Sequence, residues 1–239
     1  MIDKNLTFMQ HIQYLKGKVS KGIGILYKCK NYFSSETLKT LYYSFVHPYL
    51  NYCLPVWGST YETYLCPLIK LQKRAVRFVG GAARYDHTDP LFRSLRILKL
   101  EQMYVYTVQL FMYKFSKTRF RQRLDDQEVV ESMQSLNQNQ SNNQRKTVLP
   151  SIFEGFFLRN DTYHNYNTRW GSMYRTPLLR TFPADRTVRL RGVHISNYFL
   201  HHLTSDSSYI TYKFALKNFI INNSVNYGYC LSFLTSLDL

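Results

Sequence analysis

The spacing of apolar residues predicts a long helix near the N-terminus. Between Leu6 and Tyr32, apolar positions recur every three or four residues, from Ile12 to Leu26. This period places them on one face of a helix. The same stretch contains three glycines, each of which costs a helix up to about 1 kcal/mol relative to alanine. They can also permit another backbone to approach closely. These glycines are Gly17, Gly22 and Gly24.

A second helix is predicted from Glu36 to about His47. Ser34 or Ser35 can serve as its N-cap, and the carboxylate of Glu36 is favourable in a first turn. Pro48 is expected to end or kink this helix. The following residues, YLNYCLPVWGS at 49–59, are predicted to be irregular because they contain a second proline and a glycine.

The third predicted helix has two chemically distinct faces. It is expected to begin near Pro67, which a first turn tolerates, and to run to Val79, before Gly80 and Gly81. One side of it is apolar and contains Leu68, Leu71, Ala75 and Phe78. Basic residues at offsets 0, 3, 4 and 7 share another face, and these are Lys70, Lys73, Arg74 and Arg77.

The rest of the chain is predicted to be less regular. A helix is expected from about Leu100 to Phe115, followed by a flexible polar insertion at 117–147, which includes the Asn- and Gln-rich LNQNQSNNQRK. Short extended pieces are predicted at 164–170 and Thr187–Ile195, and a helix from Ser207 or Ser208 to Ile221. We therefore expect a mainly α protein with a helical bundle at 1–116 and a smaller mixed region at 148–239, with a helix near its end.

The net charge of the chain indicates which class of partner it binds. The 239 residues include 31 Lys+Arg and 15 Asp+Glu, a formal net charge of +16. Residues 1–116 hold 16 basic and 6 acidic side chains, a net of +10, and no acid lies between Glu62 and Asp86. Such an excess favours a polyanionic partner, with nucleic acid first and an anionic membrane second. The basic face of the third helix is the leading candidate. The alternative is that this face is only the solvated side of a core helix.

Motifs for catalysis are not found. Phosphate-binding loops, paired metal-ligand signatures and nucleophile motifs do not occur in the sequence. The closest acidic pair, Asp125-Asp126, falls in the predicted insertion. Four cysteines are too widely spaced for a zinc site, and we expect reduced, mostly buried thiols in an intracellular protein of the nucleus or cytoplasm. We predict no catalytic residue, metal site, cofactor or small-molecule substrate.

Membrane insertion is also not expected. The stretch from Thr40 to Tyr61 carries no formal charge and is long enough to span a bilayer. It contains Pro48, Pro55 and several polar residues, which a spanning helix could hardly satisfy. A buried helix followed by irregular chain fits this stretch better.

A set of motifs, in one order along the chain, resembles a known family. They are KVSKGIGIL at 18–26, L-Y-x-S-x-V-x-P-Y-L-x-Y at 41–52, V-W-G at 56–58, L-Q-K-R-A-x-R at 71–77 and the run at 87–115. After the insertion they continue with LPSIFEGFF, H-x-Y-x-T-R at 164–169, VRLRGVHISNYF and SYITYKFALKNFI. This order is similar to the region that follows the palm in reverse transcriptases of non-LTR (LINE) retrotransposons of the jockey-like group.

The resemblance implies a thumb-like region at 1–116 and the C-terminal region of the polymerase at 148–239. The catalytic carboxylates of the family would lie upstream of Met1, so we expect a fragment that lacks the palm. It would bind RNA or an RNA–DNA template–primer duplex without a catalytic site of its own. The implied contacts are Lys70, Lys73, Arg74 and Arg77, and the first helix adds the basic residues Lys16, Lys18 and Lys21.

Two alternatives remain open at this stage. The chain could be a non-functional relic of a mobile element with no autonomous activity. It could instead be part of an active RNA-directed DNA polymerase, if upstream exons belong to the same gene. The sequence predicts no oligomeric state.

Overall fold

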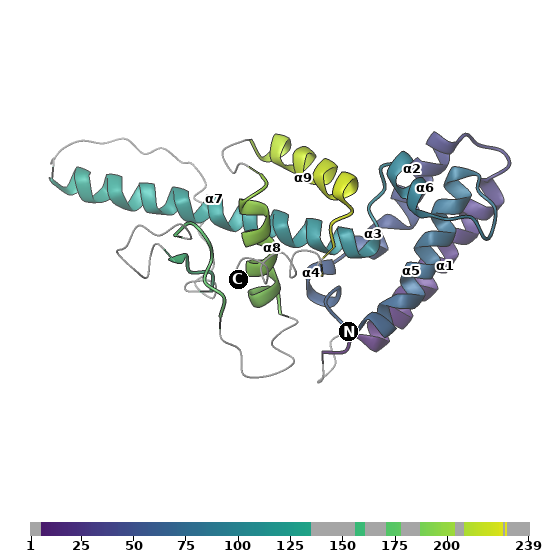
Figure 1. The fold of residues 1–239 in the computed structure, drawn as a ribbon, viewed down its shortest axis with the longest axis horizontal. Helices are drawn as coiled ribbons and strands as arrows, with labels where there is room; N and C mark the ends of the chain where they lie inside the picture. Colours follow the sequence, from purple (N-terminus) through teal and green to yellow (C-terminus); the bar gives the residue numbers. More distant parts are fainter. Residues whose placement is uncertain are drawn as a thin grey trace.

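A computed structural model describes residues 6–134, 156–160, 171–177, 187–203, 208–226 and 228, with side chains described only up to 117 within the first range. Regular structure in these ranges is helical, apart from one isolated antiparallel bridge between Arg159 and Tyr174 (Figure 1). This confirms the prediction of a mainly α fold. The predicted extended piece at 164–170 lies outside the described residues.

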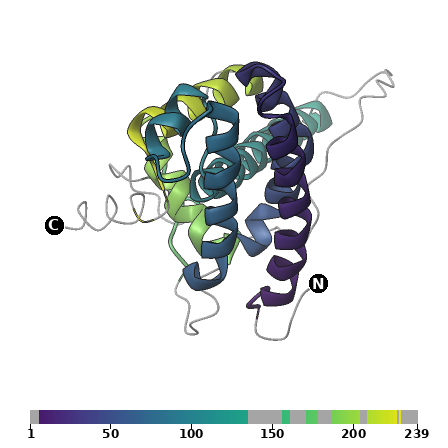
Figure 2. The same cartoon turned by 90° about the vertical axis from the view of Figure 1, so that its right-hand side faces the viewer.

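Two long helices run side by side in the same direction in the N-terminal half (Figure 2). They are α1, Met9–Cys29, and α5, Glu62–Gly80. At their N-terminal ends, the hydroxyl of Thr60 donates to the carbonyl of Thr7 at 2.7 Å. At their C-terminal ends, the rings of Tyr27 and Phe78 lie 5.5 Å apart. The parallel arrangement brings the end of α1 beside the end of the basic helix.

The apolar face predicted for α1 is its buried face. Its five apolar positions from Ile12 to Leu26 are buried, as the helical spacing requires. Gly22 lies against the next helix, α2 (Ser35–Phe45), and a Cβ there would meet the Phe45 carbonyl oxygen at 2.6 Å. The close approach that the glycines suggested therefore occurs at Gly22. Gly17 and Gly24 face open space.

The helix α2 begins as predicted, with Ser34 at its N-cap accepting from the Thr37 backbone N–H. The stretch after it was predicted to be irregular, and this is wrong. It contains two short helices, α3 at His47–Asn51 and α4 at Leu54–Trp57. Each proline falls in the first turn of a helix, where its missing N–H has no intrahelical acceptor, so it begins a helix there.

The predicted start of the basic helix is also wrong. The helix α5 begins at Glu62, and Pro67 lies inside it. Leu65 and Leu68 are buried on either side of the proline, and this packing offsets the lost backbone hydrogen bond. The predicted end is confirmed, because Gly81 adopts φ +65° and terminates the helix.

The side-chain amide of Gln72 joins three elements in the core. Its Nε2 donates to the Tyr42 hydroxyl at 3.0 Å and to the Leu98 carbonyl at 2.9 Å, and its Oε1 accepts from the Leu100 N–H at 2.9 Å. These bonds link α2 and α5 to the start of α7, Leu100–Gln134. A short helix, α6 at Asp89–Ser94, precedes that start.

The helix α7 extends much further than predicted. Its expected end was Phe115, yet its backbone is helical to Gln134, so the first part of the predicted flexible insertion, 117–134, is helical. The sequence from Leu100 to Gln134 contains neither glycine nor proline, and therefore nothing in it breaks the helix. The remainder of the predicted insertion, 135–147, lies outside the described residues.

Two C-terminal helices pack against α7 (Figure 1). They are α8, Val188–Leu200, and α9, Tyr209–Asn223. The helix α9 confirms the prediction for this segment. The extended piece predicted at Thr187–Ile195 is wrong because most of α8 is buried, and burial on several sides removed the one-sided pattern that marks a helix.

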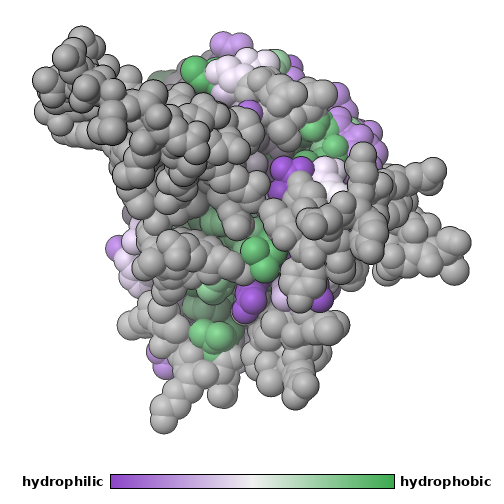
Figure 3. Space-filling model, turned by 90° about the vertical axis from the view of Figure 1, so that its left-hand side faces the viewer, coloured by the Kyte–Doolittle hydropathy of each residue, from purple (hydrophilic) through white to green (hydrophobic). Residues whose placement is uncertain are grey.

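The described residues of both halves share one hydrophobic core. Tyr113 of α7 stacks on Tyr212 of α9 at a centroid distance of 4.1 Å, and the Gln109 amide donates to the Tyr212 hydroxyl at 2.7 Å. Among the described residues visible at one end of the molecule, some hydrophobic side chains lie near the centre of the view, next to hydrophilic ones (Figure 3). Among the described helices, none has both the length and the hydrophobicity needed to cross a bilayer.

Candidate nucleic-acid interface

Three of the four basic residues predicted on α5 line one pocket of about 690 Å³. These residues, Lys70, Arg74 and Arg77, lie on the side of α5 opposite its buried face. Two further cations join them, Lys30 from the end of α1 and Arg84 from the loop after α5. No carboxylate lines this pocket, so five positive charges share one concave surface.

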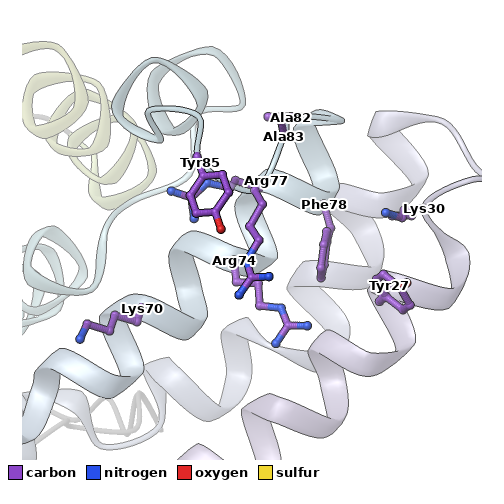
Figure 4. Close-up of a pocket in the computed structure, with 10 residues that line it drawn as sticks. Tyr27, Lys30, Lys70, Arg74, Arg77, Phe78, Ala82, Ala83 and Tyr85 are labelled. Atoms are coloured by element: carbon purple, nitrogen blue, oxygen red, sulfur yellow. The ribbon is translucent and has the colours of Figure 1, made fainter.

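Aromatic rings alternate with these cations (Figure 4). The Lys30 Nζ lies 4.8 Å from the Tyr27 ring centroid and 5.4 Å from that of Phe78. The Arg74 guanidinium carbon lies 5.6 Å from the Phe78 centroid on α5. Phe78 therefore stands between the arginine and the lysine. A ring face attracts a cation without neutralising its charge, so the pocket keeps its positive potential.

The loop after α5 folds back over the pocket. The Ala82 N–H donates to the Arg77 carbonyl at 3.0 Å, next to the left-handed Gly81. The Asp86 carboxylate then accepts from the Ala83 N–H at 2.7 Å. Arg77 Nε donates to the Asp86 carbonyl at 3.0 Å. These bonds fix the position of the loop that carries Arg84, whose guanidinium carbon lies 5.7 Å from the Tyr85 ring centroid.

Lys73 is the predicted α5 residue that does not line this pocket. It lies on the flank of α5 that faces α6, where the Asp89 carboxylate forms an ion pair with Lys99 Nζ at 2.9 Å. The pKa of Asp89 is lowered, mainly by its hydrogen bond to Lys99 and also by the charges of Lys73 and Arg93. Part of the charge of Lys73 is thus balanced within the protein.

The three lysines predicted on α1 also lie outside the pocket. Lys16 precedes Tyr27 by eleven residues, about three helical turns, so it shares the flank of Tyr27 at a distance of about 16 Å. Lys18 and Lys21 lie on the other flank, toward the side where Gly22 meets α2. Lys18 Nζ is 5.4 Å from the Tyr14 ring centroid.

Sequence reasoning missed Lys30, Arg84 and the three rings of the pocket. Phe78 was assigned to the apolar side of α5, and it does contact Tyr27 there. A weak signal existed, because an arginine and a tyrosine are adjacent shortly after the glycine that ends α5, with two alanines between. The signal for Lys30 is absent from any local pattern, since Lys30 is 40 positions before Lys70 and reaches the pocket only by the packing of α1 on α5.

The described residues hold no group of three or more His, Cys, Asp or Glu side chains placed to bind a metal ion. The side chains of Asp125 and Asp126 lie outside the described set. Cys29, Cys53 and Cys66 are free thiols, and Cys53 is exposed while the other two are partly exposed. The expectation of mostly buried cysteines is therefore wrong for Cys53, whereas Cys29 and Cys66 are partly buried, and Cys230 is outside the described residues.

Comparison with known proteins gives one distant similarity. The chain is 29% identical over 119 residues to the RNA-directed DNA polymerase from mobile element jockey of Drosophila melanogaster. The aligned part is 48% of this chain and 13% of that protein. No protein family model matches the chain, and no solved structure matches it. The similarity supports an origin related to retrotransposon reverse transcriptases.

Proposed function

We propose that this chain binds the backbone of an RNA–DNA duplex without reading its sequence, through the basic side of α5. The observation that carries the proposal is the pocket where five cations meet without a carboxylate. The similarity to an RNA-directed DNA polymerase is the reason for proposing an RNA–DNA duplex as the ligand, since a template–primer duplex is the substrate of that activity.

The spacing of the cations suits a phosphate backbone. From Lys70 to Arg77, α5 rises by about 10 Å, and successive phosphates of one strand are about 3.4 Å apart along a duplex axis. The three side chains therefore span about three phosphates. Arginine guanidinium groups bind phosphate oxygens in a bidentate manner, while Lys70 adds a more mobile point charge.

The thumb-like role remains part of this proposal. The chain would hold a duplex next to a polymerase centre, and polymerisation itself requires carboxylates that converge on metal ions. The chain spans 13% of the length of the jockey polymerase that it resembles. We therefore assign duplex binding to this chain, and we assign no step of DNA synthesis to its residues.

Salt dependence tests the proposal directly. Fluorescence anisotropy with a blunt duplex of about 20 base pairs should give an affinity that falls roughly 40- to 150-fold between about 50 and about 200 mM salt, for three or four phosphate contacts. Two duplexes of unrelated sequence should bind equally. An affinity that does not change with salt would sink the proposal.

Charge-matched variants locate the contact. The double substitution Lys70→Gln with Arg74→Gln should weaken binding and reduce the salt slope by about 2, because two phosphate contacts are lost. The control is Lys114→Gln with Lys213→Gln, which removes the same charge from exposed positions on α7 and α9 that do not line the pocket. If the control weakens binding as much as the pocket variant, the effect is one of net charge and the pocket is not the interface.

A further inference from the structure

The ring of Tyr85 is 87% exposed, although it lies at the rim of the basic pocket. Some aromatic side chains of the N-terminal half, such as Tyr42 and Trp57, are buried in the core, and among the exposed ones Tyr85 has the largest exposed fraction. Tyr85 instead sits in the loop that Arg77 and Asp86 hold against α5. A ring presented to solvent by an ordered loop is available for stacking by a ligand.

The pocket is also larger than phosphate contacts require. A volume of about 690 Å³ is within the range of pockets that hold small organic ligands. Paired bases remain stacked inside a duplex, so only the backbone of paired nucleotides can approach α5. A base from an unpaired nucleotide can leave its strand and enter such a pocket.

The remaining pocket groups complement the parts of one nucleotide. Arg84 approaches the Tyr85 ring, leaving the rest of the ring open to a base. Arg74 and Lys70 lie on α5 below this loop and can contact the phosphates on either side of that base. Aromatic stacking combined with a cationic path for the backbone is the usual arrangement for binding single strands.

We propose that the pocket binds an unpaired nucleotide next to the duplex, with its base stacked on Tyr85 and its phosphates on Lys70 and Arg74. The inference rests on the proposed function, because it assigns a single-stranded extension to the same basic site. The proposed ligand is an unpaired nucleotide that is part of a strand. Binding of a free nucleotide is tested separately.

The test compares four ligands by fluorescence anisotropy with the full chain. They are a blunt RNA–DNA duplex, the same duplex with an overhang of about four nucleotides, the same overhang made of abasic sites, and a mononucleotide as competitor. Stacking of one base should make the overhang duplex bind about 5- to 150-fold tighter than the blunt one. The abasic overhang should lose this gain, because it retains the phosphates and lacks the bases.

Substitutions of Tyr85 test whether its ring provides the tighter binding of the overhang duplex. Tyr85→Ala should abolish the preference, so that the overhang and blunt duplexes bind with equal affinity, whereas Tyr85→Phe should keep the preference. The control is Tyr32→Ala, which removes another highly exposed tyrosine, 83% exposed, that does not line the pocket. Both alanine substitutions remove exposed rings, so neither is expected to disturb the core.

The outcomes separate the two proposals. Salt-sensitive binding of the blunt duplex with no gain from the overhang, or a gain that survives Tyr85→Ala, would overturn the unpaired-nucleotide site and leave duplex binding intact. A gain with the abasic overhang equal to that with bases would also overturn it. Binding of the overhang duplex with no affinity for the blunt duplex would overturn duplex binding. Competition by the mononucleotide at the affinity of the overhang would show a free-nucleotide pocket instead.

Discussion

Arg77 Nε donates a hydrogen bond to the backbone carbonyl of Asp86 at 3.0 Å, across the loop that follows α5. Arg77 was predicted as a phosphate contact, and this bond gives it a structural role as well. A guanidinium has five N–H donors, so the bond leaves donors for a ligand. The neighbouring Arg74 contacts the Phe78 ring and carries charge into the same pocket.

Substitution by lysine should therefore change the stability of the protein differently at Arg77 and at Arg74. Arg77→Lys keeps the charge but loses the fixed bond to Asp86, and should reduce the free energy of unfolding by about 1 kcal/mol. Arg74→Lys should change it by less than about 0.5 kcal/mol. Urea denaturation measures both. Equal destabilisation by the two substitutions would show that the Asp86 bond does not contribute.

Glycine substitutions test the contact of α1 with α2. Gly22→Ala places a Cβ 2.6 Å from the Phe45 carbonyl oxygen and should destabilise the protein by about 1 to 3 kcal/mol. Gly17→Ala, in open space on the same helix, should stabilise it by about 0.5 to 1 kcal/mol. Thermal unfolding of both variants shows which substitution stabilises the protein and which destabilises it. A stabilising Gly22→Ala would contradict the close packing of these two helices.

Removal of the buried amide of Gln72 should be costly. Gln72→Leu leaves the Leu98 carbonyl and the Leu100 N–H without the bonds that the side chain provides. The expected loss is about 2 to 4 kcal/mol in the free energy of unfolding, because buried polar groups lose their partners. Gln102→Leu removes two bonds, a longer one to the Ile220 carbonyl at 3.3 Å and a partly buried one from the Lys99 N–H, and should cost less. Denaturant titration ranks the two, and the reverse order would refute this role of Gln72.

Stability should fall as the pH drops from 7 to 5. Burial lowers the pKa of His47 below its ordinary value of 6.5, with a smaller contribution from the charge of Lys217. A lowered folded-state pKa means that the unfolded chain binds the proton first, so the stabilisation is present above 6.5 and is lost as the pH falls toward the folded value. His11 and His202 shift in the same direction by burial.

Denaturation at several pH values measures this slope, and His47→Asn should make it shallower. The Asp89 carboxylate does not interfere, because its pKa is lowered from 3.8 and its contribution is lost only at more acidic pH. A stability that is constant from pH 7 to 5, or a slope that His47→Asn leaves unchanged, would contradict the burial of His47.

The sequence determined the elements whose apolar residues face one side. The buried face of α1, the basic side of α5 and the helix α9 follow from periodicity, because a helix half exposed to water alternates its chemistry every three or four residues. The pattern was not informative for α8, which is buried on several sides. The helix α2 does end before Pro48, but the prolines misled at α4, which begins with Pro55 in its first turn, and in α5, where Pro67 lies inside the helix.

Only the tertiary structure decided what the basic side of α5 faces. Lys30 and Tyr27 enter the pocket because α1 packs parallel to α5, and Arg84 and Tyr85 enter it because Asp86 and Arg77 fold the loop back. Lys73 does not line the pocket, and its charge acts instead on Asp89 of α6, which lies beside it. A local pattern records which way a side chain points from its own helix. The electrostatic potential of a pocket depends on charges that several elements bring together, and the sequence spacing of those charges carries no sign of their proximity.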